Sequence, residues 1–321
     1  MTAPDRAGPD DRDERGQHDD RDAWRSWPPE RVEREYSPSS AIGGDYAPFV
    51  AAWAERSAAA RRAATGRYDL RFGDGPDDRL DLFPATASEP APLLAFLHGG
   101  YWQEGRKELY HFPAAALVGD GIAYAAIEYP LCPATTVGAI VEGAVRAVAW
   151  LREHAGSLGV DARRIVVAGH SAGGQLVAEV ALADAIAGRA PLAGVVPVSG
   201  VLELEPIVGT SLNDALGLDV ATARSLSPQL RLETAALAAP LPPAVVAWGE
   251  REPSEFGRQS RTFAATWAGR GGRVDSFEVA GRNHFDIVFD LGDPATRLGS
   301  AIRGLLSAEG PARPHPGQAR P

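Results

Sequence analysis

Hydrophobic and polar residues alternate most regularly in two short segments between residues 67 and 83. These segments, RYDLRF and RLDLF, have the two-residue period of strands with one buried face. The turn-forming sequence GDGPDD separates them, so together they predict an antiparallel β-hairpin. Upstream, the sequence APFVAAWAERSAAARRA predicts a helix that begins at about Pro48.

Continuous apolar runs replace this alternation after the hairpin. They are PLLAFLH, IAYAAIEY, RIVVAG, AGVVPVS, PAVVAWG and RVDSFEV. Segments of helix length separate nearly all of them, most clearly TVGAIVEGAVRAVAWLREHAG from Thr136. Buried strands that alternate with helices are typical of a mostly parallel sheet with helices on both faces. The chain therefore predicts an α/β/α sandwich that opens with the antiparallel hairpin.

The two ends of the chain lack this patterning. Residues 1–30 and 309–321 are rich in Asp, Arg, Gly and Pro, and we expect both to be disordered. A folded domain at residues 31–308 remains. Within it, residues 201–242 predict short helices and loops, which we expect to form a small cap over the catalytic edge of the sheet.

Composition narrows the classes of function. The chain has 321 residues, of which 45% are hydrophobic, and no run approaches the roughly 18 apolar residues of a membrane span. A net charge of -10 argues against non-specific binding to nucleic acid. The N-terminus has no secretory signal, and a single cysteine, Cys132, suits a reducing compartment. We expect a cytoplasmic protein that binds neither nucleic acid nor membranes.

A candidate nucleophile follows the run RIVVAG. Residues 169–173 read Gly-His-Ser-Ala-Gly and match the G-x-S-x-G elbow, in which a sharp turn between a strand and a helix exposes the serine. The predicted strand before Ser171 and the helix-forming run after it supply that context. The alternative is a serine that only caps the helix, without chemistry.

The general base is sought among seven histidines. His18 and His315 lie in the tails, and His154 ends a helix. His98 and His170 stand in turns, and His111 precedes the elbow, where this fold places no base. His284 follows the last predicted strand, and it alone satisfies the order serine, acid, histidine.

The acid that would orient this histidine belongs in the loop after PAVVAWG. That loop offers Glu250, Glu252 and Glu255 and no aspartate. Asp286 lies just beyond His284 and would require the chain to fold back on itself. The residues alone do not choose among the three glutamates.

Two glycines end the run PLLAFLH, in the sequence HGGYW. A serine hydrolase needs backbone N–H groups aimed at the oxyanion, from the residue after the nucleophile and from the loop after the third strand. Ala172 would supply the first group, and Gly100 and Tyr101 would supply the others. This requirement explains why backbone without bulky side chains is needed at the end of that strand.

Several of these segments together resemble a known family. HGGYW, GHSAGG, EPSEFGRQS and NHFDIV are similar to the corresponding motifs of the kynurenine formamidase (arylformamidase) family of α/β hydrolases. REYSPSS from Arg34 and LDLFPA from Leu80 also match, so the resemblance extends from about Tyr36 to the final helix. Related hormone-sensitive-lipase-like esterases carry a third glycine in place of Tyr101. The resemblance implies the α/β-hydrolase fold.

The resemblance also implies roles. Ser171 matches the nucleophile and His284 the base, and Glu252 stands where animal members have aspartate, which favours it over Glu250 and Glu255. The implied reaction is hydrolysis of N-formyl-L-kynurenine to L-kynurenine and formate through a formyl-enzyme, without a metal or organic cofactor. The partner is then a small aromatic molecule.

Four aromatic residues next to the catalytic motifs are candidates for the walls of its binding slot: Tyr101, Trp102, Phe256 and Phe285. Ordinary packing is the alternative for each of them.

Three other interpretations remain. A carboxylesterase for small acyl or aryl esters would use the same triad. A formamidase-like enzyme of a biosynthetic pathway would act on a different N-formyl or carbamoyl aromatic. A catalytically silent binding protein would have lost the serine, the base or the oxyanion glycines, and all of these are present. Nothing in the sequence decides between a monomer and a homodimer.

Overall fold

The computed structural model describes residues 22–86 and 89–307. Its strands are β1 (Arg67–Arg71), β2 (Arg79–Phe83), β3 (Ala91–Leu97), β4 (Ala123–Ile127), β5 (Val160–His170), β6 (Gly194–Val198), β7 (Ala244–Gly249) and β8 (Val274–Val279). Within the described residues they form one eight-stranded sheet in the order β1-β2-β4-β3-β5-β6-β7-β8. The hairpin β1–β2 is antiparallel, and β2 also pairs antiparallel with β4. All later pairs are parallel.

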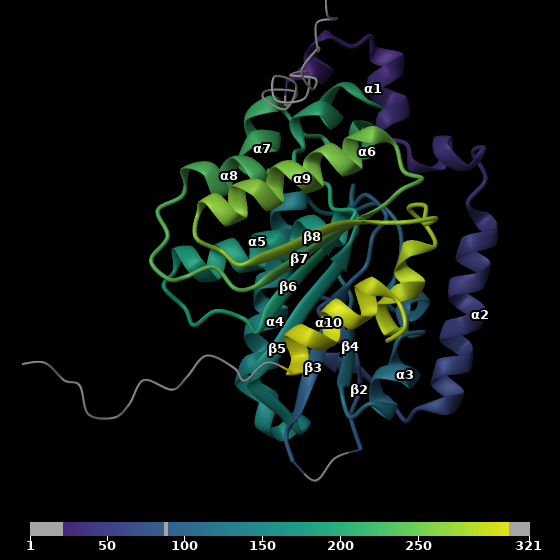
Figure 1. Ribbon diagram of the computed structural model, residues 1–321, viewed down its shortest axis with the longest axis vertical. Helices are drawn as coiled ribbons and strands as arrows, with labels where there is room; N and C mark the ends of the chain where they lie inside the picture. The colour runs from purple at the N-terminus through teal and green to yellow at the C-terminus, as the bar shows by residue number, and fades with distance from the viewer. Residues whose placement is uncertain (1–21, 87–88, 308–321) are drawn as a thin grey trace, which may run out of the picture.

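Helices cover both faces of this sheet (Figure 1). The α-helices are α1 (Pro29–Glu35), α2 (Ala47–Ala63), α3 (Ala114–Gly119), α4 (Val137–Leu158), α5 (Ala172–Ile186), α6 (Asn213–Leu216), α7 (Val220–Ser225), α8 (Pro228–Thr234), α9 (Ser254–Gly269) and α10 (Arg297–Ser307). The 3₁₀-helices are η1 (Ala23–Ser26), η2 (Pro38–Ile42), η3 (Lys107–Tyr110), η4 (Glu205–Gly209) and η5 (Ile287–Gly292). In the described ranges, no helix combines the length and the apolar character that crossing a bilayer requires.

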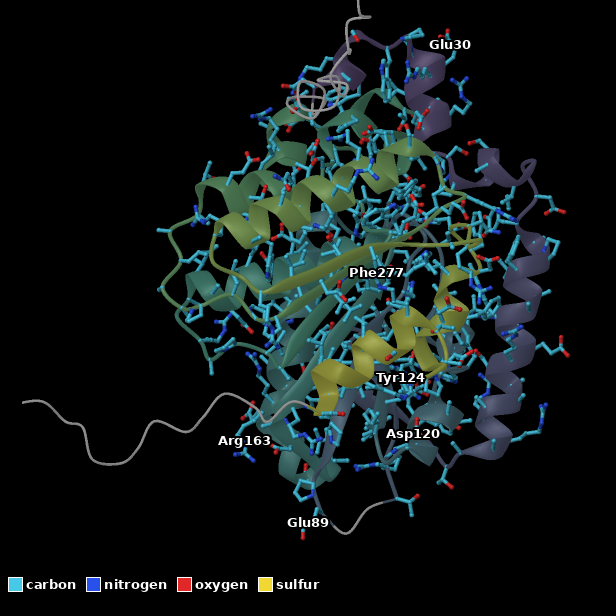
Figure 2. All side chains as sticks on the ribbon, in the orientation of Figure 1. Glu30, Glu89, Asp120, Tyr124, Arg163 and Phe277 are labelled. Carbon is cyan, nitrogen blue, oxygen red and sulfur yellow. The ribbon has the colours of Figure 1, made fainter. Side chains whose placement is uncertain are left out.

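Two hydrophobic cores result, one on each face of the sheet. Because successive side chains of a strand point to opposite faces, Leu93 and Leu97 of β3 join the core under α4, α5 and α9. Leu94 and Phe96 of the same strand join the core under α2, α3 and α10. In Figure 2, the labelled Tyr124 and Phe277 of this second core lie inside the molecule, whereas Glu30, Glu89 and Arg163 project from its edge.

These elements confirm the sandwich that the patterning predicts, with its antiparallel hairpin and its parallel strands in the expected segments. The helix expected from about Pro48 is α2.

The predicted start of the folded domain at residue 31 is wrong. Residues from Ala23 onward already form η1 and α1, and Arg25 pairs with Glu205 at 2.7 Å. Composition suggested disorder there because the contacts that order this segment come from far along the chain. The expectation of disorder for residues 1–21 and 309–321 lies outside the described residues.

Candidate active site

Ser171 occupies the sharp turn between β5 and α5. Its backbone lies at φ 55° and ψ -117°, a conformation that side-chain-bearing residues rarely adopt. Small neighbours make this turn possible: a Cβ on Gly173 would lie 2.1 Å from the carbonyl oxygen of Leu97. A Cβ on Gly169 would lie 2.1 Å from the carbonyl oxygen of Gly173. The elbow therefore requires the glycines that the motif contains.

His284 and Glu252 form a hydrogen-bonded pair beside this elbow. The distance between His284 Nδ1 and Glu252 Oε2 is 3.0 Å, and both side chains are almost fully buried. The other carboxylate oxygen accepts hydrogen bonds from Ser199 Oγ at 2.6 Å and from the Gly249 N–H at 2.7 Å. Because an ionised carboxylate only accepts, Nδ1 carries the proton and Nε2 is left to receive one.

Two of the other candidate acids are engaged elsewhere. Glu250 accepts a hydrogen bond from the Gly281 N–H at 2.6 Å and is exposed. Asp286 accepts one from the Asn283 N–H at 2.8 Å, and burial raises the pKa of its carboxyl. Neither contacts the ring of His284, so neither can orient it.

Glu255 belongs to a separate buried network. It forms an ion pair with Arg258 at 2.7 Å and accepts a hydrogen bond from the hydroxyl of Tyr36 at 2.6 Å. Gln259 donates to the same hydroxyl at 2.6 Å. Of the four candidate acids, all within the described residues, Glu252 alone contacts the histidine.

The loop after β3 presents free backbone N–H groups next to Ser171. Gly100 has φ 116° and Tyr101 has φ 47°. The N–H groups of Gly100, Tyr101 and Ala172 donate to no carbonyl of the described residues. A Cβ on Gly99 would lie 3.0 Å from the Cβ of Ser171, which shows how closely the loop approaches the elbow. These three N–H groups have the chemistry of an oxyanion hole.

Buried polar contacts hold this loop in place. His98 Nε2 lies 3.0 Å from Glu128 Oε1, and His98 Nδ1 lies 2.8 Å from the carbonyl oxygen of Gly99. The hydroxyl of Tyr129 donates to the carbonyl oxygen of His98 at 2.8 Å. The pKa of the Glu128 carboxyl is lowered by its hydrogen bonds to His98 and to backbone N–H groups, which outweigh the cost of burial. His98 thus helps to hold the turn after β3 in place.

Replacing Gly100 with alanine tests the role of the loop. The new Cβ would lie 2.2 Å from the carbonyl oxygen of Glu104, so the turn must open and its N–H groups must move. We expect kcat to fall by about 10²–10³-fold, the usual cost of losing one oxyanion donor. Gly121→Ala is a matched control, because Gly121 also has a positive φ of 75° but has nothing within 4 Å of its Cβ position. Equal kcat values for the two variants would contradict the assignment.

His170, next to Ser171, is buried and in contact with the ring of His284. The centres of the His170 and His284 rings are 4.5 Å apart. Neither ring nitrogen of His170 has a hydrogen-bond partner among the described residues. Burial, and secondly the charge of His284, hold the pKa of His170 well below its usual range. His170 therefore stays neutral in the folded protein.

This shift gives the protein a pH-dependent stability. The unfolded chain takes up a proton on residue 170 near pH 6.5 and the folded chain does not, so acidification favours unfolding. We expect the free energy of unfolding of the native chain to fall more steeply below pH 6.5 than that of His170→Asn. The difference should approach about 1.4 kcal/mol per pH unit. Urea unfolding at pH 7, 6 and 5 measures it, and parallel slopes would refute this account.

Ser171 and His284 line one cavity of about 960 Å³, together with Gly100 and Tyr101. Glu252 lies behind His284, outside the lining. The cavity thus brings together the predicted nucleophile, the predicted base and two of the three predicted oxyanion residues, Gly100 and Tyr101.

The predicted cap does not form the main cover of this cavity. Of residues 201–242, only Ser211 and Leu212 line it, whereas many lining residues lie between 33 and 54. The segment that carries α1, η2 and α2 therefore covers the site. Figure 1 shows α2 along the side of the sheet and α1 at the same end of the molecule as α6 and α7.

Aromatic side chains outside the catalytic motifs extend the predicted slot. Tyr101 and Phe285 line the cavity as predicted, and Tyr46, Trp53 and Tyr110 join them. The rings of Tyr46 and Phe285 stack, with their centres 5.1 Å apart. Trp53 Nε1 donates to the carbonyl oxygen of Phe285 at 3.0 Å, although 232 positions separate these residues. That separation explains why the sequence contains no local sign of the added residues.

Trp102 and Phe256 correct the prediction, because neither lines the cavity. Trp102 is fully buried, and its Nε1 donates to Gln175 Oε1 at 3.3 Å. Phe256 packs against His284, with the centres of the two rings 4.6 Å apart. Both residues are part of the packing around the catalytic elements, and not of a substrate wall.

Known proteins resemble this chain over most of its length. Kynurenine formamidase of Salmo salar is 29% identical over 84% of this chain and 94% of its own. Kynurenine formamidase of Danio rerio is 27% identical over the same shares. These matches confirm the family resemblance expected from the motifs.

Solved structures agree on the fold. A putative thioesterase from Silicibacter sp. has a TM-score of 0.72 and 28% identity, over 85% of this chain and 98% of its own. An esterase from Pyrobaculum calidifontis has a TM-score of 0.67 and 22% identity, over 82% of this chain and 93% of its own, and it supports the fold alone.

Residues 94–287 match the model of a protein family whose description is "alpha/beta hydrolase fold". This match covers more than half of the 321 residues, and it contains the elbow serine, the histidine and the glutamate. The chain is a hydrolase, and it belongs to the α/β-hydrolase family.

Proposed function

We propose that this protein is a serine hydrolase that cleaves an aryl formamide, with N-formyl-L-kynurenine as its substrate. The observation that carries the proposal is that Ser171, His284, Gly100 and Tyr101 line one aromatic cavity, with Glu252 hydrogen-bonded to His284 outside the lining. The N–H groups of Gly100, Tyr101 and Ala172 donate to no carbonyl of the described residues. The similarity to kynurenine formamidases over nearly their whole length supports the choice of substrate.

The reaction would proceed in two halves. Ser171 Oγ attacks the formyl carbon while His284 Nε2 takes its proton, and the negative oxygen is stabilised by the N–H groups of Gly100, Tyr101 and Ala172. His284 then protonates the departing aniline nitrogen. A water molecule, deprotonated by His284, attacks the formyl-enzyme and releases formate. Glu252 holds the imidazole and stabilises its cation throughout.

The residues around Ser171 suit a substrate with a small acyl part and a large aromatic leaving group. The acyl part of the substrate is a single formyl carbon, which would lie where the backbone at Gly99 approaches Ser171 closely. The leaving group is an aromatic ketone, which Tyr46, Trp53 and Phe285 would surround. The proposal includes a cytoplasmic location for the enzyme.

The test compares substrates. We expect the purified protein to hydrolyse N-formyl-L-kynurenine, followed as kynurenine absorbance, with a kcat/KM well above that for p-nitrophenyl acetate. A general carboxylesterase would show the reverse order. Rapid ester cleavage with negligible formamide turnover would reject the formamidase assignment and leave a serine esterase.

A further inference from the structure

Some charged side chains of the cavity already form hydrogen bonds within the protein, and others keep groups free to bind a ligand. Glu33, Asp45 and Glu104 supply its carboxylates, and Arg106 is the one arginine or lysine among its lining residues. Glu33 accepts hydrogen bonds from the N–H and the hydroxyl of Ser211. Asp45 accepts one from a backbone N–H at the start of α2, at 2.9 Å. Both of these carboxylates are therefore already used in holding the cover of the site.

Glu104 and Arg106 remain available to a ligand. Both oxygens of Glu104 lie 3.1 Å from the same hydroxyl, that of Tyr46, which leaves further acceptor capacity on the carboxylate. Burial and the neighbouring Glu104 carboxylate raise the pKa of Tyr46, so its hydroxyl stays protonated and donates. Arg106 is exposed to the cavity, and its guanidinium has no hydrogen-bond or ion-pair partner among the described residues.

Backbone contacts connect Glu104 and Arg106 to the oxyanion loop, the turn after β3 that contains Gly99, Gly100 and Tyr101. The Glu104 N–H donates to the carbonyl oxygen of Gly100 at 3.0 Å. Gly105 has φ 96°, and a Cβ there would lie 2.7 Å from the carbonyl oxygen of Gly99. The backbone of residues 104–106 is thus folded directly onto the loop that would hold the oxyanion.

We infer that Glu104 and Arg106 form a subsite for a zwitterionic α-amino-acid group on the leaving side of the substrate. Glu104 accepts the ammonium group, and Arg106 binds the carboxylate through its planar fork of N–H groups. An anion without an ammonium group would be repelled by the three carboxylates, and a cation without a carboxylate would leave Arg106 unpaired. This inference rests on the proposed function, whose product carries such a group.

The aromatic part of the ligand fits between this subsite and the nucleophile. Tyr46, which contacts Glu104, stacks on Phe285, and the ring of Phe285 lies 5.6 Å from that of His284. A ligand whose aniline nitrogen faces His284 would therefore lie along Phe285 and Tyr46. Its head group would then reach Glu104 and Arg106.

Equilibrium binding of the product tests this subsite without requiring turnover. Calorimetry measures the Kd of L-kynurenine and of two analogues, kynuramine, which lacks the carboxylate, and desaminokynurenine, which lacks the ammonium group. We expect Arg106→Gln to weaken L-kynurenine and desaminokynurenine by about tenfold and to leave kynuramine unchanged. Glu104→Gln, whose amide oxygen still accepts from Tyr46, should weaken the binding of L-kynurenine and kynuramine. Its affinity for desaminokynurenine should be unchanged or higher, because one repelling carboxylate is removed.

Matched controls lie outside the cavity. Arg273→Gln, at an exposed position before β8, and Glu153→Gln, at an exposed position of α4, should bind all three ligands as the native chain does. Equal losses for all three ligands, or no loss in either cavity variant, would overturn the subsite. If the native chain fails to cleave the formamide but shows these selective losses, the subsite stands and the formamidase proposal falls. Turnover of the formamide with unchanged binding in Arg106→Gln would instead support the formamidase proposal and reject the subsite.

Discussion

Replacing Ser171 with alanine will reduce kcat for the formamide and for p-nitrophenyl acetate by at least about 10⁴-fold, because the attacking oxygen is removed. The fold should be retained, since alanine is smaller and the close contacts of the elbow are made by Gly169 and Gly173. Residual turnover above the rate in water would come from the oxyanion N–H groups and from binding. Steady-state kinetics and the thermal unfolding midpoint measure the two effects separately.

Ser300→Ala is the matched control for this experiment. Ser300 is an exposed serine of α10, and its loss should change neither kcat nor stability. If Ser171→Ala kept more than a tenth of the native kcat while Ser300→Ala behaved as native, nucleophilic catalysis by Ser171 would be excluded. A water molecule activated by His284 would then be the better candidate.

Changing Glu252 to glutamine will lower kcat by about 10³–10⁴-fold without a comparable change in KM. The amide can keep the hydrogen bonds from Ser199 and Gly249 through its oxygen, so the loop should remain folded. Its NH₂ group would face His284 Nδ1, which then has to accept the hydrogen bond. The proton of the imidazole moves to Nε2, the nitrogen that must take the proton of the serine.

The neighbouring glutamates provide the comparison. Glu250→Gln should keep nearly native kcat, because Glu250 only accepts a bond from the Gly281 N–H at the surface. Glu255→Gln should lower the unfolding midpoint, because Arg258 would lose a buried partner. A larger loss of kcat in either of these variants than in Glu252→Gln would move the acid to that residue.

The strands, the hairpin and the catalytic elbow are predictable from short patterns, because local spacing determines them. An alternation of apolar and polar residues predicts a strand, and glycines beside a serine predict the elbow, whatever the rest of the chain does. The acid is a different case. Three glutamates share one loop, and the hydrogen bonds from Ser199 and Gly249 that fix Glu252 depend on the packing of β6 and β7.

The walls of the cavity were the least predictable part. Trp102 follows the oxyanion loop directly, but its φ of 57° and its bond to Gln175 place the ring in the core. Tyr46 and Trp53 lie far from every catalytic motif in sequence, and they reach the site because α2 packs beside Phe285. Side-chain direction and long-range packing decide both outcomes, and neither is encoded in spacing.

The cover of the cavity has a consequence for the order in which the protein assembles during synthesis. The ribosome releases Tyr36 and Trp53 early, yet their partners Glu255 and Phe285 are made 219 and 232 positions later. Contacts between such distant residues are entropically expensive and form late. The nascent chain therefore completes the turn that carries Ser171, the proposed nucleophile, long before it can enclose it, and the cavity closes only after Phe285 has emerged.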